Sequence, residues 1–370
     1  MKVLHVIGSL EEGGAEAVLY NLICQTPHIR HFVVTLVAGG KYVSLLRSDG
    51  IEVCSLDIRK NPLSLMNAVK TLRSIITDFR PHAVQSWMYH AGVISAFACG
   101  SRISARLFLG VHNTAVDSHR NKLPTYASIR LLARLSRSYS SVIYCSKSAR
   151  DAHEAIGYPR EKTVVITNGI STERFKPCSR LRQKIRDRLG VDASSHLFGM
   201  VARVHPQKNY RGLIEALKIV REGTLSPFKI VLAGRGTDTD AALQQWILDS
   251  NLRDVVIALG PRDDIPAIMT AIDTLVLPSE FGEAFPMVLC EAMSCGTPCI
   301  ATDVGDSANI IGDLGIIVAP GDPEALAGAM INRIEFGLEP EGFDTKTRTH
   351  AIQTFSIGAM ALAYEAAWAE

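Results

Sequence analysis

The stretch KVLHVIGSLEEGGAEAVLYNLICQTPHIRHFVVTLVA, residues 2–38, decides the fold of the first half of the chain. A short apolar run rich in β-branched residues leads into a helical pattern, and a second such run follows. Strands that alternate with longer helices are typical of a parallel sheet covered by helices on both faces. The alternation continues to KTVVITNG, and a second series starts at HLFGMVARV. The sequence therefore predicts two α/β domains, each with a doubly wound parallel sheet.

The chain has 370 residues, which is too long for one ordinary hydrophobic core and indicates two domains. The polar segment STERFKPCSRLRQKIRDRLG, residues 171–190, is predicted to connect them and to lead into a helix. We place the first domain at residues 1–170 and the second at 171–352. The last segment, 353–370, is apolar over much of its circumference as a helix, so we expect it to pack against the protein.

The composition is that of a globular protein, with 47% hydrophobic and 21% charged residues. No apolar run approaches the length of about 18 residues that a membrane-spanning helix needs. The start of the chain meets Glu11 and Glu12 soon after a short apolar run, which favours a first strand over a signal peptide and predicts a cytoplasmic protein. The eight cysteines lack the paired spacing of zinc sites and are expected to be small buried thiols.

The two halves of the chain differ in charge, although the net charge is only +2. Up to Phe175 there are 21 Lys and Arg against 12 Asp and Glu, and beyond it there are 18 against 25. This asymmetry indicates either an anionic partner for the first half or an uneven decoration of two solvated surfaces. Between Arg102 and Arg150 the acidic residue is Asp117, and the basic residues are Arg106, Arg120, Lys122, Arg130, Arg134, Arg137 and Lys147. The spacing of Arg130, Arg134 and Arg137 places them on one side of a helix.

Two glutamates stand eight positions apart in EFGEAFPMVLCEAMSCGTP, residues 280–298. Pro286 suits the front of a helix and Gly296 its end, so we expect Glu283 in a loop and Glu291 on the helix. The amides at a helix N-terminus attract phosphate, while carboxylates accept hydrogen bonds from hydroxyls. A ligand with hydroxyls next to its phosphates, such as a nucleotide sugar, satisfies both. The alternative is an ordinary amphipathic helix with a solvated Glu291.

Three further motifs follow predicted strands. Gly13 and Gly14 precede a helix and let the backbone approach a ligand, although a Gly-Gly turn is common in α/β proteins. Arg203 and Lys208 suit a diphosphate beyond the end of a strand, or are ordinary solvated loop residues. His112 ends a strand and is either a catalyst or a hydrogen-bonded structural residue.

The motif AGRGTDTDA is similar to two known patterns and completes neither of them. Gly234 and Gly236 begin a dinucleotide fingerprint, but its third glycine is missing, and no acidic residue ends a second predicted strand about 20 positions later. Asp238 and Asp240 form an Asp-x-Asp, which holds a divalent metal in some sugar transferases. We expect them instead to cap the following helix.

Together these motifs resemble those of the retaining glycosyltransferases of family four, which have the GT-B fold, and the resemblance covers almost the whole chain. The elements that carry it are the Glu283 and Glu291 pair, the GGAE loop, the Arg203 and Lys208 pair, the Asn168–Gly169 step and the tail DVGDSANIIGDLGIIVAPGDPEALA. The chain has Asp306 where the family often has a second glycine. The resemblance implies two Rossmann-like domains that face a central cleft, with the C-terminal helix crossing back to the first domain.

The resemblance also implies roles for these residues. Glu291 would hold the ribose hydroxyls, Glu283 would hold a hydroxyl of the transferred sugar, and His112 would reach that sugar from the acceptor side. The catalytic set implied is Glu283, Arg203, Lys208 and His112. The implied donor-binding set is Gly13, Gly14, Arg203, Lys208, Arg262 beside the base, Glu283, Ala284, Phe285, Pro286, Met287, Val288, Leu289 and Glu291.

By the same resemblance, the chain would move a hexose or N-acetylhexosamine from a UDP-sugar to a glycan or lipid-linked acceptor, with retention and without a metal or a tightly bound cofactor. The product would be a cell-envelope polysaccharide or a glycolipid, and no nucleic acid would bind. The arginine face would then meet anionic phospholipid or a lipid diphosphate at the inner face of the cell membrane. Alternatives are a nucleotide-sugar epimerase of the same architecture, an NAD-dependent oxidoreductase and a non-catalytic binding subunit.

Overall fold

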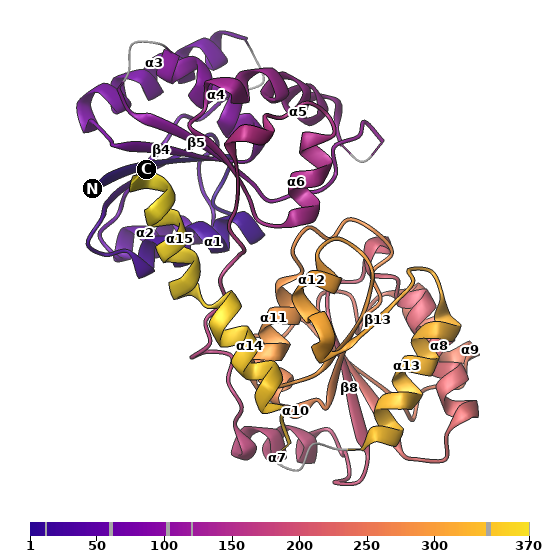
Figure 1. Cartoon of the computed structure of the whole chain (residues 1–370). Coiled ribbons are helices and arrows are strands. Elements are labelled where there is room, and N and C mark those ends of the chain that lie inside the picture. Colours follow the sequence, from indigo (N-terminus) through magenta and orange to yellow (C-terminus); the bar gives the residue numbers. More distant parts are fainter. Residues whose placement is uncertain (12, 59–61, 101–103, 120, 338–341, 370) are drawn as a thin grey trace. The chain divides into compact units, whose positions relative to one another are not determined.

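The computed structural model describes residues 1–370 except 12, 59–61, 101–103, 120, 338–341 and 370 (Figure 1). The chain forms two compact units. Unit 1 consists of Met1–Gly169 together with Ile357–Glu370, and unit 2 consists of Ile170–Ser356.

Unit 1 is built on a seven-stranded sheet in the order β3-β2-β1-β4-β5-β6-β7, and all neighbouring strands run parallel. Its central strands are buried on both faces, which explains why they are mostly apolar in the sequence, although His5, Gln85 and Ser86 are also buried in them. The strands are β1 (Lys2–Ile7), β2 (Arg30–Thr35), β3 (Glu52–Ser55), β4 (Ala83–Trp87), β5 (Arg106–Val111), β6 (Ser141–Tyr144) and β7 (Thr163–Val165).

The helices of unit 1 connect these strands as the predicted alternation requires. They are α1 (Gly14–Gln25), α2 (Lys41–Ser48), α3 (Pro62–Phe79), α4 (Met88–Cys99), α5 (Leu123–Leu135) and α6 (Lys147–Glu154), with short 3-10 turns at Ser136–Ser138 and Arg160–Lys162. The last helix of the chain, α15 (Ile357–Ala369), also belongs to this unit.

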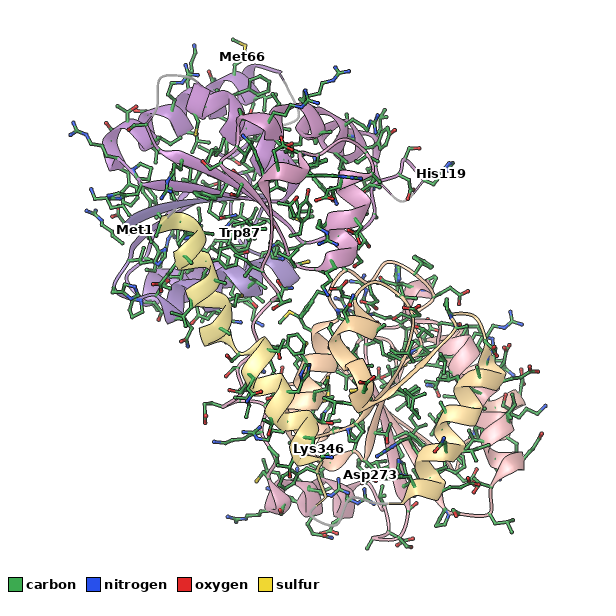
Figure 2. All side chains as sticks on the ribbon, viewed as in Figure 1. Met1, Met66, Trp87, His119, Asp273 and Lys346 are labelled. Carbon is green, nitrogen blue, oxygen red and sulfur yellow. The ribbon has the colours of Figure 1, made fainter. Side chains whose placement is uncertain are left out.

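Aromatic side chains fix α15 in the core of unit 1, as the packing of an apolar C-terminal helix requires. Trp368 is fully buried, and its indole N–H donates to Gln85 Oε1 at 3.1 Å. Tyr364 stacks on Trp87 with ring centroids 5.8 Å apart, and Trp87 lies inside the unit beside α15 (Figure 2). The guanidinium of Arg106 donates to the carbonyl of Trp368.

Unit 2 is built on a six-stranded sheet in the order β10-β9-β8-β11-β12-β13, and again every neighbouring pair is parallel. The strands are β8 (His196–Val201), β9 (Phe228–Ala233), β10 (Val256–Gly260), β11 (Thr274–Leu277), β12 (Cys299–Thr302) and β13 (Ile316–Val318). The helices are α7 (Ser179–Arg188), α8 (Tyr210–Gly223), α9 (Ala241–Asp249), α10 (Ile265–Ala271), α11 (Met287–Ser294), α12 (Ser307–Ile311), α13 (Pro323–Phe336) and α14 (Thr345–Phe355), with 3-10 turns at Pro206–Lys208 and Gly312–Leu314.

Helix α7 lies inside the polar segment 171–190, whereas the sequence predicts a helix that follows that segment, and ion pairs anchor α7 within unit 2. Arg182 and Arg186 both pair with Asp273, which directly precedes β11 and is 8% exposed. Burial would raise the pKa of Asp273, but the two guanidinium groups outweigh burial and lower it. Removing one partner from such a buried set leaves an uncompensated charge, so these residues stabilise the start of the unit.

All eight cysteines are free thiols, and five of them are buried, whereas Cys24 is exposed. Within the described part of the chain, none of the helices combines the length and apolar character needed to cross a lipid bilayer.

Candidate active site

The acid pair lies where the sequence predicts, after the carboxyl end of β11 in unit 2. Glu283 is in the loop that follows this strand, and Glu291 is on α11. Pro286 is the residue immediately before the helix, and Gly296 follows its end with a φ of +71°. Ligands of parallel α/β sheets bind at the carboxyl ends of the strands, so both carboxylates lie at the edge of the sheet that the fold provides for a ligand.

Glu283 is held by two side chains, one distant in the sequence and one in the same loop region. The carboxylate is in an ion pair with Lys208, and it accepts a hydrogen bond from Ser279 Oγ at 2.6 Å. Glu283 is only 7% exposed, so these partners fix its orientation as well as compensating its charge. The sequence pointed to Lys208 and Glu283 separately, and the structure shows that they form an ion pair. The sequence did not point to Ser279.

Further backbone contacts set the position of this loop. The amide of Glu280 donates to the carbonyl of Gln207 at 2.8 Å, which joins the loop after β8 to the loop after β11. Thr302 Oγ1 donates to the carbonyl of Ser279 at 2.5 Å. Three strand ends of unit 2 therefore meet at the pair formed by Lys208 and Glu283.

Gly305, after β12, is a positioning residue that sequence reasoning did not select. Its φ is +64°, and a Cβ at this position would overlap the carbonyl oxygen of Glu283. Only glycine combines this backbone conformation with so close an approach. The adjacent Asp306, where the family often has a second glycine, is buried and precedes α12. Gly305 could have been selected from the sequence, because it stands in DVGDS directly after a predicted strand.

Glu291 is partly buried rather than fully exposed on a solvated helix face. Burial raises its pKa to about 7, and the charge of Arg174 partly opposes this shift. Near neutral pH the side chain is therefore divided between a carboxylate, which accepts hydrogen bonds, and a neutral acid, which also donates one. Arg174 is another residue that the sequence did not point to.

The two other cationic residues of unit 2 that the sequence singled out, Arg203 and Arg262, also follow strand ends. Arg203 comes two residues after β8 and is exposed. Arg262, in the loop after β10, forms a bidentate pair with Asp264 in which Nε and Nη2 lie 2.8 and 2.7 Å from the two carboxylate oxygens. Hydrogen bonds from Arg262 hold the pKa of Asp264 below its usual value. Arg203 is exposed to solvent at this edge and has no such pair among the described contacts, and the same is true of Arg235 after β9.

Both aspartates of the Asp-x-Asp motif were expected to cap the following helix, and the structure confirms this for Asp240 alone. Asp240 is the N-cap of α9, and its side chain accepts from the amide of Leu243 at 2.9 Å. The carboxylate of Asp238 lies against Gly260. The described residues contain no group of three or more His, Cys, Asp or Glu side chains placed to hold a metal ion.

The predicted residues of unit 1 follow β1 and β5. Helix α1 begins at Gly14 with Gly13 as its N-cap, and Gly14 has open space where a Cβ would stand. A Cβ on Gly13 would overlap the carboxylate of Glu16, which folds back over the helix N-terminus. Burial raises the pKa of Glu16.

His112 directly follows β5 and is enclosed by the end of β4. Its ring stacks on Trp87 with centroids 5.3 Å apart, and its amide donates to the sulphur of Met88 at 3.2 Å. Burial lowers the pKa of His112 to about 4, partly offset by the side chain of Asn168, so the ring is neutral at physiological pH. Both ring nitrogens are buried, and the side chain of Asn168 is the polar group that affects them among the described residues.

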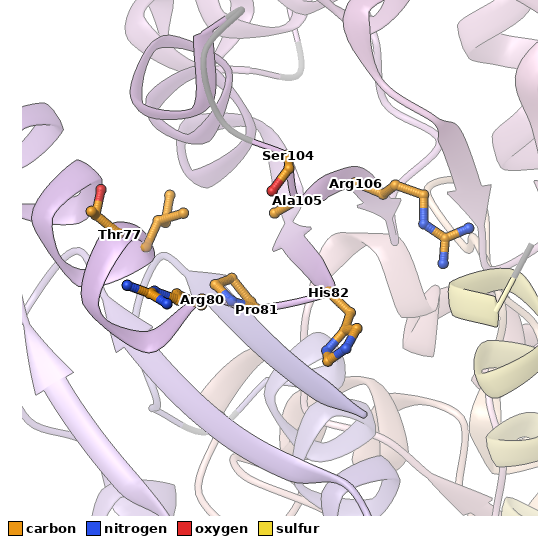
Figure 3. A pocket seen from close by; sticks show the side chains of 8 residues that line it. Thr77, Arg80, Pro81, His82, Ser104, Ala105 and Arg106 are labelled. Atoms are coloured by element: carbon orange, nitrogen blue, oxygen red, sulfur yellow. The ribbon is translucent and has the colours of Figure 1, made fainter.

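A large cavity of about 620 Å³ in unit 1 lies away from these residues (Figure 3). It is lined by segments that precede β4 and β5, at the amino edge of the sheet. Its basic side chains do not converge on one point: Arg106 is directed to the carbonyl of Trp368, and His82 Nδ1 accepts from the amide of Lys2 at 3.0 Å. We therefore do not assign the active site to this cavity.

Two family models together match most of the chain. The model described as Glycosyltransferase Family 4 matches residues 12–174, and the model described as Glycosyl transferases group 1 matches residues 195–335. The chain belongs to the group 1 glycosyltransferases.

This group 1 glycosyltransferase is similar to curated proteins over different spans. It is 34% identical over 176 residues to the UDP-Gal:alpha-D-GlcNAc-diphosphoundecaprenol alpha-1,3-galactosyltransferase of Escherichia coli. The matched residues cover 46% of this chain and 44% of that protein. The match therefore spans less than half of the relative. A longer match, 27% identical over 311 residues, is to EpsF of Bacillus subtilis and covers 82% and 79% of the two chains.

Solved structures resemble the group 1 glycosyltransferase over nearly its full length. The structure of Anabaena HepE in complex with UDP has a TM-score of 0.87 and 25% sequence identity, and the match covers 99% of each chain. A HepE structure in complex with UDP-glucose has a TM-score of 0.82 and 26% identity, again over 99% of each chain. The two parallel-sheet units are those of the GT-B fold, as the sequence predicts.

Proposed function

We propose that this group 1 glycosyltransferase transfers a hexose or N-acetylhexosamine from a UDP-sugar to a lipid-linked or polysaccharide acceptor, with retention of the anomeric configuration. The observation that carries the proposal is the cluster at the carboxyl edge of the unit 2 sheet. There a buried carboxylate, Glu283, is fixed by Lys208 and Ser279 beside the start of α11, which carries Glu291. The HepE complexes with UDP and UDP-glucose support the choice of donor.

The donor fits this cluster in chemical terms. The ribose hydroxyls donate to Glu291, and a hydroxyl of the transferred sugar donates to Glu283. The diphosphate lies against the first-turn amides of α11 and the residues from Ala284 to Leu289 that lead into them, since helix N-termini favour anions. The exposed Arg203 and the ammonium of Lys208 neutralise the charge that grows on the departing diphosphate. Arg262 lies beside the base.

The chemical step is a displacement on one face of the sugar. The bond between the anomeric carbon and the diphosphate oxygen breaks, and the acceptor hydroxyl oxygen bonds to the same face of that carbon. The hydroxyl proton passes to the departing phosphate oxygen, so no protein nucleophile is required. Arg203 accelerates this step because its interaction with the leaving group strengthens as negative charge develops.

In unit 1 we assign contacts with the diphosphate to Gly13 and Gly14, and contact with the transferred sugar to His112. A neutral imidazole donates one hydrogen bond and accepts another, so His112 acts as a hydrogen-bonding partner of the sugar rather than as a cation. The named substrate of the Escherichia coli relative, a diphosphoundecaprenol-linked sugar, supports a lipid-linked acceptor.

The experiment that tests the proposal is a thermal-shift screen of the full chain with nucleotides and nucleotide sugars. A ligand present at 100 times its dissociation constant stabilises the protein by about 2.7 kcal/mol. We expect UDP and one or more UDP-sugars to raise the melting temperature, and ADP- and GDP-sugars to have smaller effects. The absence of any shift with UDP would contradict the proposed donor class.

A further inference from the structure

A second cavity, of about 440 Å³, has a lining that belongs entirely to unit 1. Residues at the carboxyl ends of β1, β2 and β4 line it, together with the first turns of α1 and α4. It therefore lies at the ligand-binding edge of the sheet, in contrast to the larger cavity at the amino edge. Its volume is within the range of about 300 to 1,000 Å³ that is common for small-molecule sites.

The lining of this cavity is mostly apolar. Val37 and Leu65 are 51% and 45% exposed, so apolar side chains border the cavity where solvent reaches it. Exposed apolar surface that lines a cavity marks a site of interaction with an apolar partner. The lining consists of described residues, and it contains Glu16 and His90 but no Lys or Arg. A carboxylate without a cation disfavours phosphate inside the cavity, so the group that fits is uncharged. Apart from Ser9, Glu16 and His90 the lining offers apolar surface, which favours an apolar group.

The wall of the cavity is continuous with the residues that hold His112. Met88 has a φ of +67°, which side chains rarely adopt, and such strained residues concentrate at ligand sites. Its sulphur accepts from the amide of His112, and the neighbouring Trp87 stacks on the ring of His112. The cavity thus shares Trp87 and Met88 with the residue that we assign to the sugar-transfer site.

We propose that this cavity receives the apolar portion of the acceptor, an alkyl or prenyl chain carried by the sugar headgroup. This inference rests on the proposed function and narrows the acceptor to an amphiphile whose uncharged, apolar part enters unit 1. The cavity has room for about 15 waters at ~30 Å³ each. An apolar chain that replaces them gains about fourfold in affinity for each methylene buried, from about 0.8 kcal/mol per CH₂.

The test uses a series of n-alkyl β-D-glucosides, from hexyl to nonyl, as probes below their micelle concentrations. Binding to the full chain is measured by calorimetry and by the change in tryptophan fluorescence, since Trp87, one of the three tryptophans, lines the cavity. We expect the dissociation constant to fall about fourfold for each added methylene. Glucose itself should bind far more weakly, and UDP should not displace the alkyl probe.

A cavity-filling variant and a matched control make the test specific. Gly8 lines the cavity, and a Cβ on it would meet no atom within 4 Å, so Gly8→Leu places a side chain in open space. Gly358 of α15 is also in unit 1 and equally open, so Gly358→Leu is the control. We expect Gly8→Leu to abolish the dependence on chain length and Gly358→Leu to keep it.

Either an equal chain-length dependence in the Gly8→Leu variant or displacement of the probe by UDP would overturn the inference. A wild-type chain that binds UDP but shows no chain-length dependence would also overturn it, while leaving the proposed function intact. A wild-type chain that binds the alkyl probes but neither UDP nor any UDP-sugar would overturn the proposed function instead.

Discussion

Replacing Glu291 with glutamine should stabilise unit 2 above neutral pH and weaken the binding of UDP. Glutamine is nearly isosteric with protonated glutamate, so the change removes the charge and keeps the shape. The same side chain would then have opposite effects on stability and on ligand binding, which is expected where a binding site holds a buried charge.

The magnitude follows from the pKa of Glu291, which burial raises from 4.5 to about 7. A carboxyl group with a raised pKa favours the folded state below its unfolded pKa, and that contribution is lost as the pH rises through the folded value. The shift corresponds to about 3 kcal/mol at 1.36 kcal/mol per pKa unit, taken as an upper limit because Glu291 is only partly buried. The glutamine variant avoids this loss. Its free energy of unfolding should therefore match that of the wild type at pH 4.5 and exceed it by up to about 3 kcal/mol at pH 8.

Urea unfolding of both proteins between pH 4.5 and 8 measures this difference, and calorimetry with UDP measures the binding. The hydrogen bonds of a charged acceptor are worth about 1.5 to 3 kcal/mol, so UDP should bind about ten- to a hundredfold more weakly to Glu291→Gln. Glu280→Gln, which changes an exposed glutamate of the preceding loop, is the control and should alter neither quantity. A stability difference that does not vary with pH, or unchanged UDP affinity in Glu291→Gln, would refute the reasoning.

Three further predictions test separate parts of the account. Arg203→Ala should lower kcat about a hundredfold and have a smaller effect on the KM for the donor. Arg211→Ala, on the surface of α8, is the control and should change neither quantity. Equal losses in kcat/KM and in donor affinity would mean that Arg203 binds the ground state and the transition state equally well. Gly305→Ala should impair transfer while UDP still binds, because its Cβ would displace Glu283. Gly312 has a similar φ of +54° and open space where a Cβ would stand, so Gly312→Ala is the control and should lose only about 1 kcal/mol of stability from backbone strain. Equal rates of transfer by the two variants would contradict the role of Gly305. Replacing Arg130, Arg134 and Arg137 with serine should reduce the salt-sensitive co-sedimentation of the protein with anionic vesicles. The control replaces the exposed Arg180, Lys218 and Arg253 with serine and should not reduce it. Equal binding of the wild type to neutral vesicles would leave the charge asymmetry unexplained.

Much of the fold could be predicted because its signals are local. The alternation of short apolar runs and helical patterns predicts both parallel sheets, and the proline and glycine around the acid pair place Glu283 in a loop and Glu291 on α11. The cap at Asp240 follows from the same kind of local chemistry. The arginine face was predicted in part: Arg130 and Arg134 are exposed on α5, whereas Arg137 is exposed in the 3-10 turn after that helix ends. Arg102 and Arg120 lie outside the described residues.

The contacts that complete the site could not be predicted, because they depend on tertiary pairing. Lys208 and Glu283 are 75 residues apart, and no local pattern links them. Gly305 matters only because the carbonyl of Glu283 packs against it, and Arg174 matters only through its charge near Glu291. The partial burial of Glu291 likewise depends on neighbours supplied by the fold, so the helical pattern alone left a solvated side chain as an alternative.

The most direct test of the account is transfer of label from UDP-[¹⁴C]sugars to lipid-linked acceptors extracted from membranes, with EDTA present and with NMR analysis of the new glycosidic bond. We predict a labelled product with the anomeric configuration of the donor. We also predict strongly reduced transfer by a Glu283→Gln variant that still binds UDP, because that change removes the charge that accepts the sugar hydroxyl and pairs with Lys208 but not the contacts with the nucleotide. Label that stays in a new sugar nucleotide without acceptor, or no incorporation from any UDP-sugar, would contradict the assignment of this chain as a UDP-sugar glycosyltransferase.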